Sequence, residues 1–192
     1  MLVYFEGVDG VGKSTQIGLC KESFPGALTT KEPGGTALGD KIREILLGSA
    51  DKISSKSENL LFLADRAEHY EKFIKPNRDK LILSDRGFVS GIAYAMANDE
   101  NLDIEELLNL NSFALGGDFG DKFIFFKATK ELLHARLFSR GTSDEIEARG
   151  VEYLMRVQGF MSIILANLKF EVLELDASEP ADALQEKIRK FI

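Results

Sequence analysis

The segment that most constrains this chain is the run of eight residues at 7–14, which reads Gly-Val-Asp-Gly-Val-Gly-Lys-Ser. It matches the pattern G-x-x-x-x-G-K-[ST], in which glycines let consecutive backbone N–H groups point at phosphate oxygens. An apolar run at residues 2–6 precedes it and a helical pattern follows it, which is the strand–loop–helix context that the motif requires. The segment therefore predicts a nucleotide phosphate site at the start of a helix.

Each polar side chain of this motif has a chemical reason for its position. The ammonium of Lys13 reaches the β- and γ-phosphates of a bound nucleotide, and the hydroxyl of Ser14 is suited to ligate Mg²⁺. Asp85 ends an apolar run, as the second metal-anchoring acid of P-loop enzymes does, although it equally fits a cap for the next helix. We expect ATP to be held by the loop and the start of its helix, that is by Gly7, Val8, Asp9, Gly10, Val11, Gly12, Lys13, Ser14 and Thr15.

Short apolar runs alternate with longer helical patterns along the chain. Runs with little polar alternation are typical of strands covered on both faces, as in a parallel sheet. Strands are expected at residues 2–6, 27–31, 80–85, 122–127 and 170–175, and helices at 13–24, 37–48, 57–76, 87–98, 103–115, 129–140, 145–168 and 179–190. We therefore predict an α/β fold of the P-loop NTPase class, with a five-stranded parallel sheet flanked by helices, in a single domain over residues 1–192.

Composition narrows the setting in which the chain works. No apolar run approaches the length that spans a bilayer, and residues 1–5 are too short for a signal peptide, so we expect a cytoplasmic protein that binds no membrane. The formal net charge of −7 argues against nucleic acid as a partner, because a phosphate backbone favours a basic surface. Cys20 is the only cysteine, so an internal disulfide is excluded, in agreement with a reducing compartment.

Five segments, taken together and in this order, resemble thymidylate kinases. They are FEGVDGVGKSTQ at 5–16, TKEPGGT at 30–36, ENLLFLADRAEH at 58–69, SDRGFVSGIAYA at 84–95 and ARLFSRGTSDEIE at 135–147. The resemblance implies a nucleoside monophosphate kinase fold and the ATP- and Mg²⁺-dependent phosphorylation of dTMP to dTDP, in dTTP synthesis for DNA replication. It also implies a homodimer. Another nucleotide or nucleoside kinase with a different acceptor, and a P-loop protein that binds nucleotide without catalysis, are the alternatives. A GTPase-like switch would need an N-K-x-D element, which is absent from the sequence.

The resemblance also implies an acceptor site. Phe62 and Arg66 are four residues apart and share a helix face, where Phe62 stacks on a pyrimidine and Arg66 donates to a ring carbonyl. Arg86 is implied to hold the 5′-phosphate, and Ser90 and Tyr94 continue its stripe at four-residue spacing. Without the family context, Phe62 would be read as a core residue and Arg66 as a charged surface residue. The implied substrate-binding residues are Asp9, Glu32, Pro33, Arg43, Phe62, Arg66, Arg86, Ser90 and Tyr94.

A short lid is implied at about residues 137–148, where a Gly-Thr-Ser sequence follows a helix. Arg136 and Arg140 lie on consecutive turns of that helix, and the resemblance implies that Arg136 contacts ATP. Arg140 is implied to offset negative charge on the phosphoryl group as it is transferred. With Lys13 and Arg86 it forms the implied catalytic set. Some relatives carry an arginine at the position of Gly10. Because this chain has no arginine there, the resemblance implies that the catalytic arginine comes from the lid. The alternative is that both lid arginines are surface charges.

The sequence departs from the family pattern at several positions of these segments. Gly87 replaces a tyrosine, Lys31 and Glu145 each replace an arginine, and Phe160 replaces a tyrosine. Ala95 replaces a glutamine that contacts the base in many relatives. The pocket is still expected, but the hydrogen bonds that hold the base are left open.

Overall fold

A computed structural model of the chain describes residues 1–48, 53–140 and 149–192, and for 138–140 it describes the backbone alone. Within these residues one parallel sheet is formed by the strands β1 (Leu2–Glu6), β2 (Leu28–Lys31), β3 (Ile82–Asp85), β4 (Lys122–Lys127) and β5 (Glu171–Asp176). Their order is β2-β3-β1-β4-β5, and every neighbouring pair runs parallel. The predicted five-stranded parallel sheet is confirmed.

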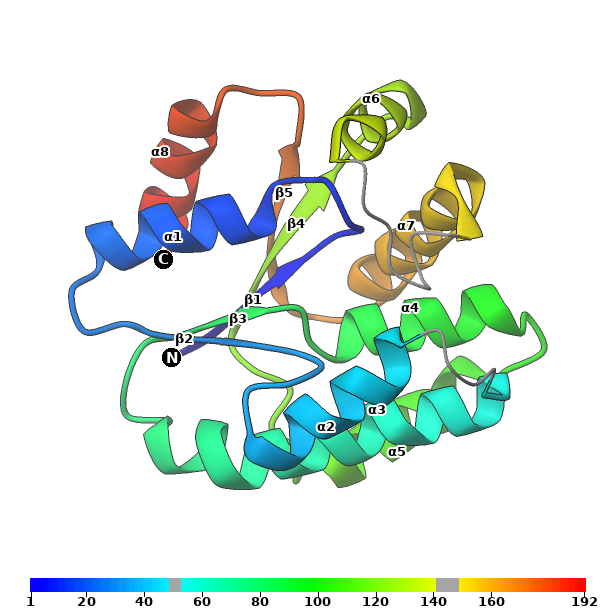
Figure 1. Cartoon of the computed structure of the whole chain (residues 1–192). Coiled ribbons are helices and arrows are strands. Elements are labelled where there is room, and N and C mark those ends of the chain that lie inside the picture. The colour runs from blue at the N-terminus through cyan, green and yellow to red at the C-terminus, as the bar shows by residue number, and fades with distance from the viewer. Residues whose placement is uncertain (49–52, 141–148) are drawn as a thin grey trace.

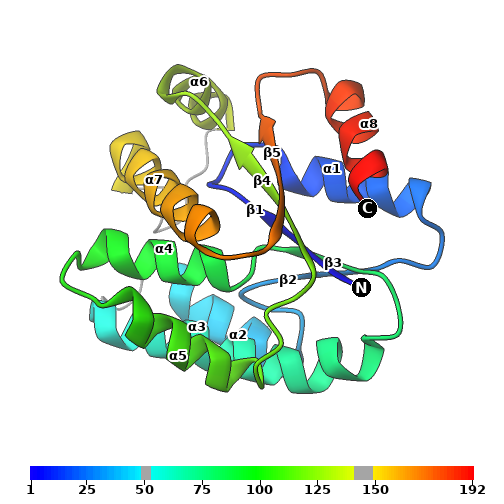
Figure 2. The same ribbon diagram turned by 180° about the vertical axis from the view of Figure 1, so that it is seen from behind.

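Eight α-helices of the described residues surround this sheet (Figure 1). They are α1 (Lys13–Ser23), α2 (Ala37–Leu47), α3 (Ser55–His69), α4 (Phe88–Asn98), α5 (Ile104–Ala114), α6 (Lys130–Arg140), α7 (Val151–Asn167) and α8 (Ala181–Phe191). Helices α1 and α8 lie side by side over one face of the sheet, and the opposite face carries α4 and α7, with α2, α3 and α5 beyond them (Figure 2). None of the helices in the described ranges has the length and apolar character needed to cross a bilayer.

The central strands are apolar because the helical layers bury both of their faces. Every residue of β1 is buried, and Tyr4 stacks on Phe123 of β4 with 5.4 Å between ring centroids. On the other side of β1, Phe5 stacks on Phe126 at 6.2 Å. Burial on both faces removes the polar alternation that a half-exposed strand would show, which explains the continuous apolar runs in the sequence.

The helix predicted at 57–76 differs most from the structure. It begins earlier, at Ser55, because the hydroxyl of Ser54 accepts a hydrogen bond from the Ser57 amide at 3.3 Å and caps the first turn. The α-helix ends at His69 and continues as a π-turn at Tyr70–Ile74 and a 3₁₀ turn at Lys75–Asn77. Pro76 has no backbone N–H, so a regular α-helix cannot continue through it. The last strand begins one residue later than predicted, and the described part of the helix predicted at 145–168 begins at 151.

The carboxyl ends of β1 and β3 bring the predicted motifs together. Phe5 pairs with Asp85 in the sheet register, and the Arg86 amide donates to the Phe5 carbonyl at 2.9 Å. The phosphate loop and the residues that follow β3 therefore emerge side by side at one edge of the sheet. This is the edge at which α/β proteins bind ligands.

Candidate active site

The loop between β1 and α1 has the backbone conformation that its glycines permit. Gly7 and Gly12 have φ angles of 143° and 101°, which side-chain-bearing residues rarely adopt. A Cβ atom on Gly7 would also lie 2.8 Å from the carbonyl oxygen of Phe126. The loop ends at the N-terminus of α1, where unpaired N–H groups and the helix dipole favour an anion. The arrangement is that of a phosphate cradle.

Lys13 supplies positive charge inside this cradle. Its buried ammonium donates to the carbonyl oxygens of Gly7 at 2.9 Å and Val8 at 3.0 Å. Burial, together with the nearby charge of Arg86, lowers the pKa of Lys13 to about 8, against the opposing effect of Asp85. A bound polyphosphate would stabilise the charged form of Lys13 and raise that pKa.

Ser14 and Asp85 form an oxygen pair beside the loop. The Ser14 hydroxyl donates to Oδ2 of Asp85 at 2.8 Å, so the two side chains meet at the mouth of the cradle. Hydroxyl and carboxylate oxygens are ligands that suit Mg²⁺. Among the residues that the structure describes, no group of three or more His, Cys, Asp or Glu side chains is placed to hold a metal ion. The donor set therefore fits an ion that takes its remaining ligands from phosphate oxygens and water.

Arg86 and Asp9 link the cradle to a second cavity. Arg86 has a φ of 72°, unusual for a residue with a side chain, and its guanidinium donates to the Gly7 carbonyl at 2.8 Å and to Asp9 Oδ1 at 2.8 Å. Burial acts to raise the pKa of Asp9, but the charges of Arg86 and Lys13 outweigh it and hold that pKa at about 2. Asp9 is thus ionised over the whole neutral range.

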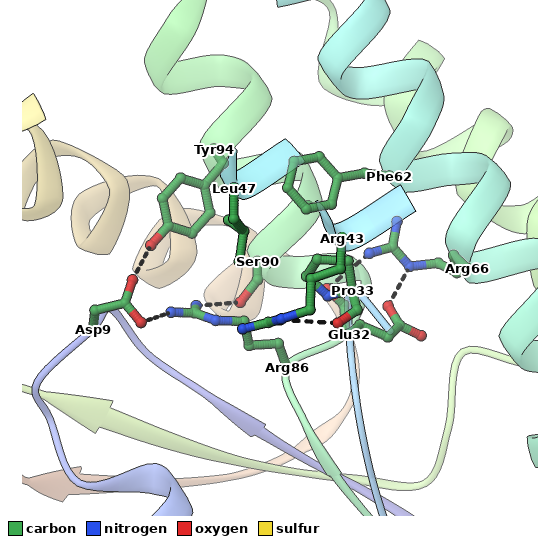
Figure 3. Close-up of a pocket in the computed structure, with 12 residues that line it drawn as sticks. Asp9, Glu32, Pro33, Arg43, Leu47, Phe62, Arg66, Arg86, Ser90 and Tyr94 are labelled. Carbon is green, nitrogen blue, oxygen red and sulfur yellow. Dashed lines mark hydrogen bonds and ion pairs between the residues drawn. The ribbon is translucent and has the colours of Figure 1, made fainter. Parts of the chain in front are cut away.

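Ser90 and Tyr94 of α4 lie on the same side as Arg86 (Figure 3). Arg86 donates to the Ser90 hydroxyl at 3.2 Å, and the Tyr94 hydroxyl donates to Asp9 Oδ2 at 3.3 Å. The guanidinium carbon of Arg86 is 5.5 Å from the centre of the Tyr94 ring, a cation–π distance. The predicted stripe is therefore assembled around one arginine.

This stripe forms one wall of a cavity at the carboxyl edge of the sheet. Its lining includes all nine of the predicted acceptor-site residues, namely Asp9, Glu32, Pro33, Arg43, Phe62, Arg66, Arg86, Ser90 and Tyr94. Leu47, Gly87 and Gly91 also line it and were not predicted as site residues. A second hollow runs over the phosphate loop and shares Asp9, Glu32, Arg43 and Arg86 with the first, so the two hollows adjoin.

Arg66 is the most constrained side chain of the acceptor cavity. Its Nε donates to Glu32 Oε2 at 2.9 Å, one Nη donates to Asn111 Oδ1 at 2.7 Å, and the other donates to the Gly87 carbonyl at 3.1 Å. Burial acts to raise the pKa of Glu32, but the charge of Arg66 and the hydrogen bond from His69 lower it. Glu32 therefore faces Arg66 as a carboxylate. Asn111 comes from a helix far along the chain, and no sequence signal pointed to it.

The remaining predicted residues lie at the edges of the site. Arg43 donates to the Pro33 carbonyl at 3.0 Å from α2. Arg136 donates to the carbonyls of Gly10 at 3.0 Å and Ala177 at 2.8 Å, beside a hollow lined by Thr15, Gln16, Ala181 and Leu184 among others. Arg140 is the last residue of α6, and its side chain lies outside the described part of the chain, as do residues 141–148 of the predicted lid.

Comparisons with known proteins agree with this geometry. A family model described as Thymidylate kinase matches residues 5–188. The chain is 69% identical to a thymidylate kinase of Campylobacter fetus over the full length of both proteins, and 60% identical to one of Campylobacter concisus over 100% of this chain and 98% of that protein. Its fold is similar to a solved thymidylate kinase structure from Candida albicans, with a TM-score of 0.78, 23% identity, and coverage of 100% of this chain and 90% of that one.

Proposed function

This chain belongs to the thymidylate kinase family, which phosphorylates dTMP to dTDP with ATP, and we propose that the residues described above perform this reaction as follows. The backbone N–H groups of residues 7–15 hold the triphosphate of ATP, and Lys13 neutralises its β- and γ-phosphates. The hollow beside Arg136 receives the adenosine part. Support for this assignment comes from the positive-φ glycines and from the position of Lys13 inside the loop.

Mg²⁺ belongs between the triphosphate and the pair formed by Ser14 and Asp85. The Ser14 hydroxyl would ligate the ion, and Asp85 would support it from the end of β3. When bound, the ion neutralises charge on the β- and γ-phosphates. Both side chains already face each other at the mouth of the cradle, so the site requires no rearrangement of the strands.

The acceptor, dTMP, occupies the cavity lined by Phe62, Arg66 and Arg86, with its phosphate toward the P-loop. Phe62 stacks on thymine, and Arg66 donates to a ring carbonyl. Arg86 holds the 5′-phosphate, and Arg43 adds charge from α2. Around the sugar, Asp9 accepts from the 3′-hydroxyl and Tyr94 leaves no space for a 2′-hydroxyl, while Glu32, Pro33 and Ser90 complete the walls.

Catalysis then consists of alignment and charge stabilisation. Arg86 places an acceptor phosphate oxygen in line with the γ-phosphorus, and Lys13 stabilises the charge on the transferring group. We assign the third catalytic residue to Arg140 of the lid at about 137–148. Both substrates are held at once, so the phosphoryl group passes directly between them and no covalent enzyme intermediate is needed. Exclusion of water from the reacting atoms prevents hydrolysis of ATP.

Beyond the site, the chain works as a single domain over residues 1–192 in the cytoplasm, as a homodimer that binds neither nucleic acid nor membrane. Support for a self-association surface comes from α2, α3 and α5, which lie on the outside of the fold (Figure 2) and carry exposed large apolar side chains. Phe113 is 88% exposed and Leu60 is 55% exposed. Light scattering that reports only monomer at micromolar concentration would contradict the dimer.

One observation carries the proposal: the P-loop hollow and the arginine-lined cavity adjoin and share Asp9 and Arg86. A coupled assay for ADP release, run with each nucleoside monophosphate in turn, tests it. We expect turnover with dTMP, weak turnover with dUMP, and none with CMP or AMP. Equal ADP release with and without an acceptor would instead identify an ATPase, and preference for another acceptor would replace dTMP as the substrate.

A further inference from the structure

The guanidinium of Arg66 is fixed from three separate elements, and two of the groups responsible lie outside the site that the family resemblance implies. Glu32 follows β2, Gly87 precedes α4, and Asn111 lies on α5, so the three hydrogen bonds approach from different directions. Arg66 and Asn111 are each only 2% exposed. Water cannot readily take the place of a lost partner there, so each bond constrains the orientation of the arginine strongly.

His69 fixes Glu32 in turn. Its Nδ1 is 3.0 Å from Glu32 Oε1, and its Nε2 is 2.6 Å from the hydroxyl oxygen of Thr30. In a neutral imidazole that donates from Nδ1 to Glu32, Nε2 is an acceptor, and the Thr30 hydroxyl then donates to His69. The second oxygen of Glu32 is left to accept from Arg66.

Asn111 is oriented by a similar constraint. Its side-chain nitrogen donates to the Leu107 carbonyl one turn earlier on α5, at 2.8 Å. That bond directs the side-chain oxygen of Asn111 toward Arg66, where it accepts the shortest of the three guanidinium bonds. Gly91 of α4 provides the space, because a Cβ atom there would lie 2.9 Å from an Nη atom of Arg66.

Three of the five N–H groups of Arg66 are occupied in this way, and two remain for a ligand in the cavity that Arg66 lines. A guanidinium only donates hydrogen bonds. It therefore matches a carbonyl oxygen at position 4 of a pyrimidine and mismatches an amino group there. A guanidinium that is free to reorient would relieve the mismatch with a 4-amino group, whereas a guanidinium held in one orientation cannot.

We propose that Asn111 and His69 are positioning residues that give the site its preference for a 4-carbonyl over a 4-amino pyrimidine, by holding Arg66 in a single orientation. This rests on the proposed placement of the acceptor base against Arg66. A site whose buried polar groups are fixed discriminates strongly, because the wrong ligand leaves them unpaired. An arginine held by fewer bonds would bind the correct base more weakly and tolerate the wrong one better.

The test measures kcat and KM of the full-length enzyme with dTMP and with dCMP as acceptors. We expect Asn111→Leu and His69→Phe, which keep the approximate shape of each side chain, to raise the KM for dTMP about tenfold while kcat changes by less than about twofold. The ratio of kcat/KM for dTMP to that for dCMP is expected to fall about tenfold or more. His69→Asn, whose amide can replace Nδ1 as the donor to Glu32, is expected to restore most of the ratio.

Gln158→Leu is the matched control. Gln158 is buried on α7 and makes two hydrogen bonds to the backbone of Ala128, at 2.9 Å and 3.0 Å, away from Arg66. It is expected to lower the melting temperature without changing the acceptor ratio. If Asn111→Leu and His69→Phe also lose stability but keep the ratio, their role is structural only and the inference is wrong.

A milder variant covers the case in which those substitutions prevent folding. Thr30→Val removes only the hydroxyl at the end of the chain of hydrogen bonds, and we expect it to lower the ratio by about threefold. An unchanged ratio in this variant would overturn the role of His69. If the wild-type enzyme itself fails to phosphorylate dTMP, the proposed function fails, and that result is distinct from an unchanged ratio in an active enzyme.

Discussion

At the scale of single residues, the site depends on buried charges that neutralise one another. Arg86 is placed by a left-handed backbone conformation and is bonded to Asp9, to the Gly7 carbonyl and to Ser90. Ser90 also donates a hydrogen bond to Glu6, a fully buried carboxyl at the end of β1. An incoming phosphate would meet an arginine whose position is already determined, which lowers the entropy cost of binding.

Glu6 gives a prediction about stability and pH. Burial raises the pKa of Glu6 from 4.5 to about 7, against the hydrogen bond from Ser90 and the charge of Arg86. The folded protein therefore retains a proton that the unfolded chain loses, and the stabilisation present below about pH 4.5 is lost as the pH rises to about 7. Glu6→Gln should reduce the loss of unfolding free energy between pH 5 and pH 8 by about 1–3 kcal/mol.

Urea denaturation of wild type and Glu6→Gln at the two pH values measures this difference. Glu22→Gln, at an exposed position of α1, is the control and should behave as the wild type does. The account of Glu6 is contradicted if Glu6→Gln and the wild type lose the same unfolding free energy over this pH range.

Gly87 and Asn111 show how much of the acceptor site the sequence could reveal. A Cβ atom on Gly87 would lie 2.4 Å from the ring of Tyr4, so the buried Tyr4 ring occupies the space that a side chain at position 87 would need. The sequence shows the exchange at 87 but not its cause, because Tyr4 is distant along the chain. Asn111 was missed for the same reason, since its contact with Arg66 joins residues 45 positions apart.

At the scale of elements, α2 and α3 carry much of the acceptor site and depend on their first turns. The Thr36 hydroxyl accepts from the Gly39 amide at 2.9 Å and caps α2, which bears Arg43 and Leu47. Asp65 of α3 accepts from the Gly34 amide at 2.8 Å and thereby holds the loop that leads into α2. These bonds connect the two helices to the loop after β2.

Removal of the α2 cap should destabilise the protein measurably. Thr36→Ala leaves the Gly39 amide without its partner, at a cost of about 1 kcal/mol. For a chain of this size that corresponds to a fall in Tm of about 2–4 °C, which thermal unfolding followed by circular dichroism can resolve. Thr36→Ser retains the hydroxyl and should unfold close to the wild-type temperature. An unchanged Tm in Thr36→Ala would show that the cap contributes little.

The accuracy with which the sequence predicted the boundaries of each strand and helix has physical causes. β1 and β4 were identified to the residue by their continuous apolar runs, whereas β3 begins at Ile82, two residues later than predicted. The end of α3 was harder, because the π and 3₁₀ turns at Tyr70–Asn77 keep the same apolar side chains inward as a regular helix would. Periodicity does not distinguish these turns from an α-helix.

At the scale of the whole molecule, function follows from the strand order. Because β1 lies between β3 and β4, the loop that holds ATP and the residues that hold the acceptor emerge at adjacent strand ends. The donor and acceptor phosphates are thereby brought end to end without further elements. The meeting of these motifs at the carboxyl edge of the sheet was predictable from sequence, because each follows a predicted strand, whereas the strand order and the fixed orientation of Arg66 required the structure.

The most direct measurement is a crystal structure of the chain with ADP and dTMP bound. The account predicts thymine stacked on Phe62 with its 4-carbonyl at Arg66, and the 5′-phosphate on Arg86 pointing toward the P-loop. A structure in which dTMP leaves Phe62, Arg66 and Arg86 without contact would contradict it.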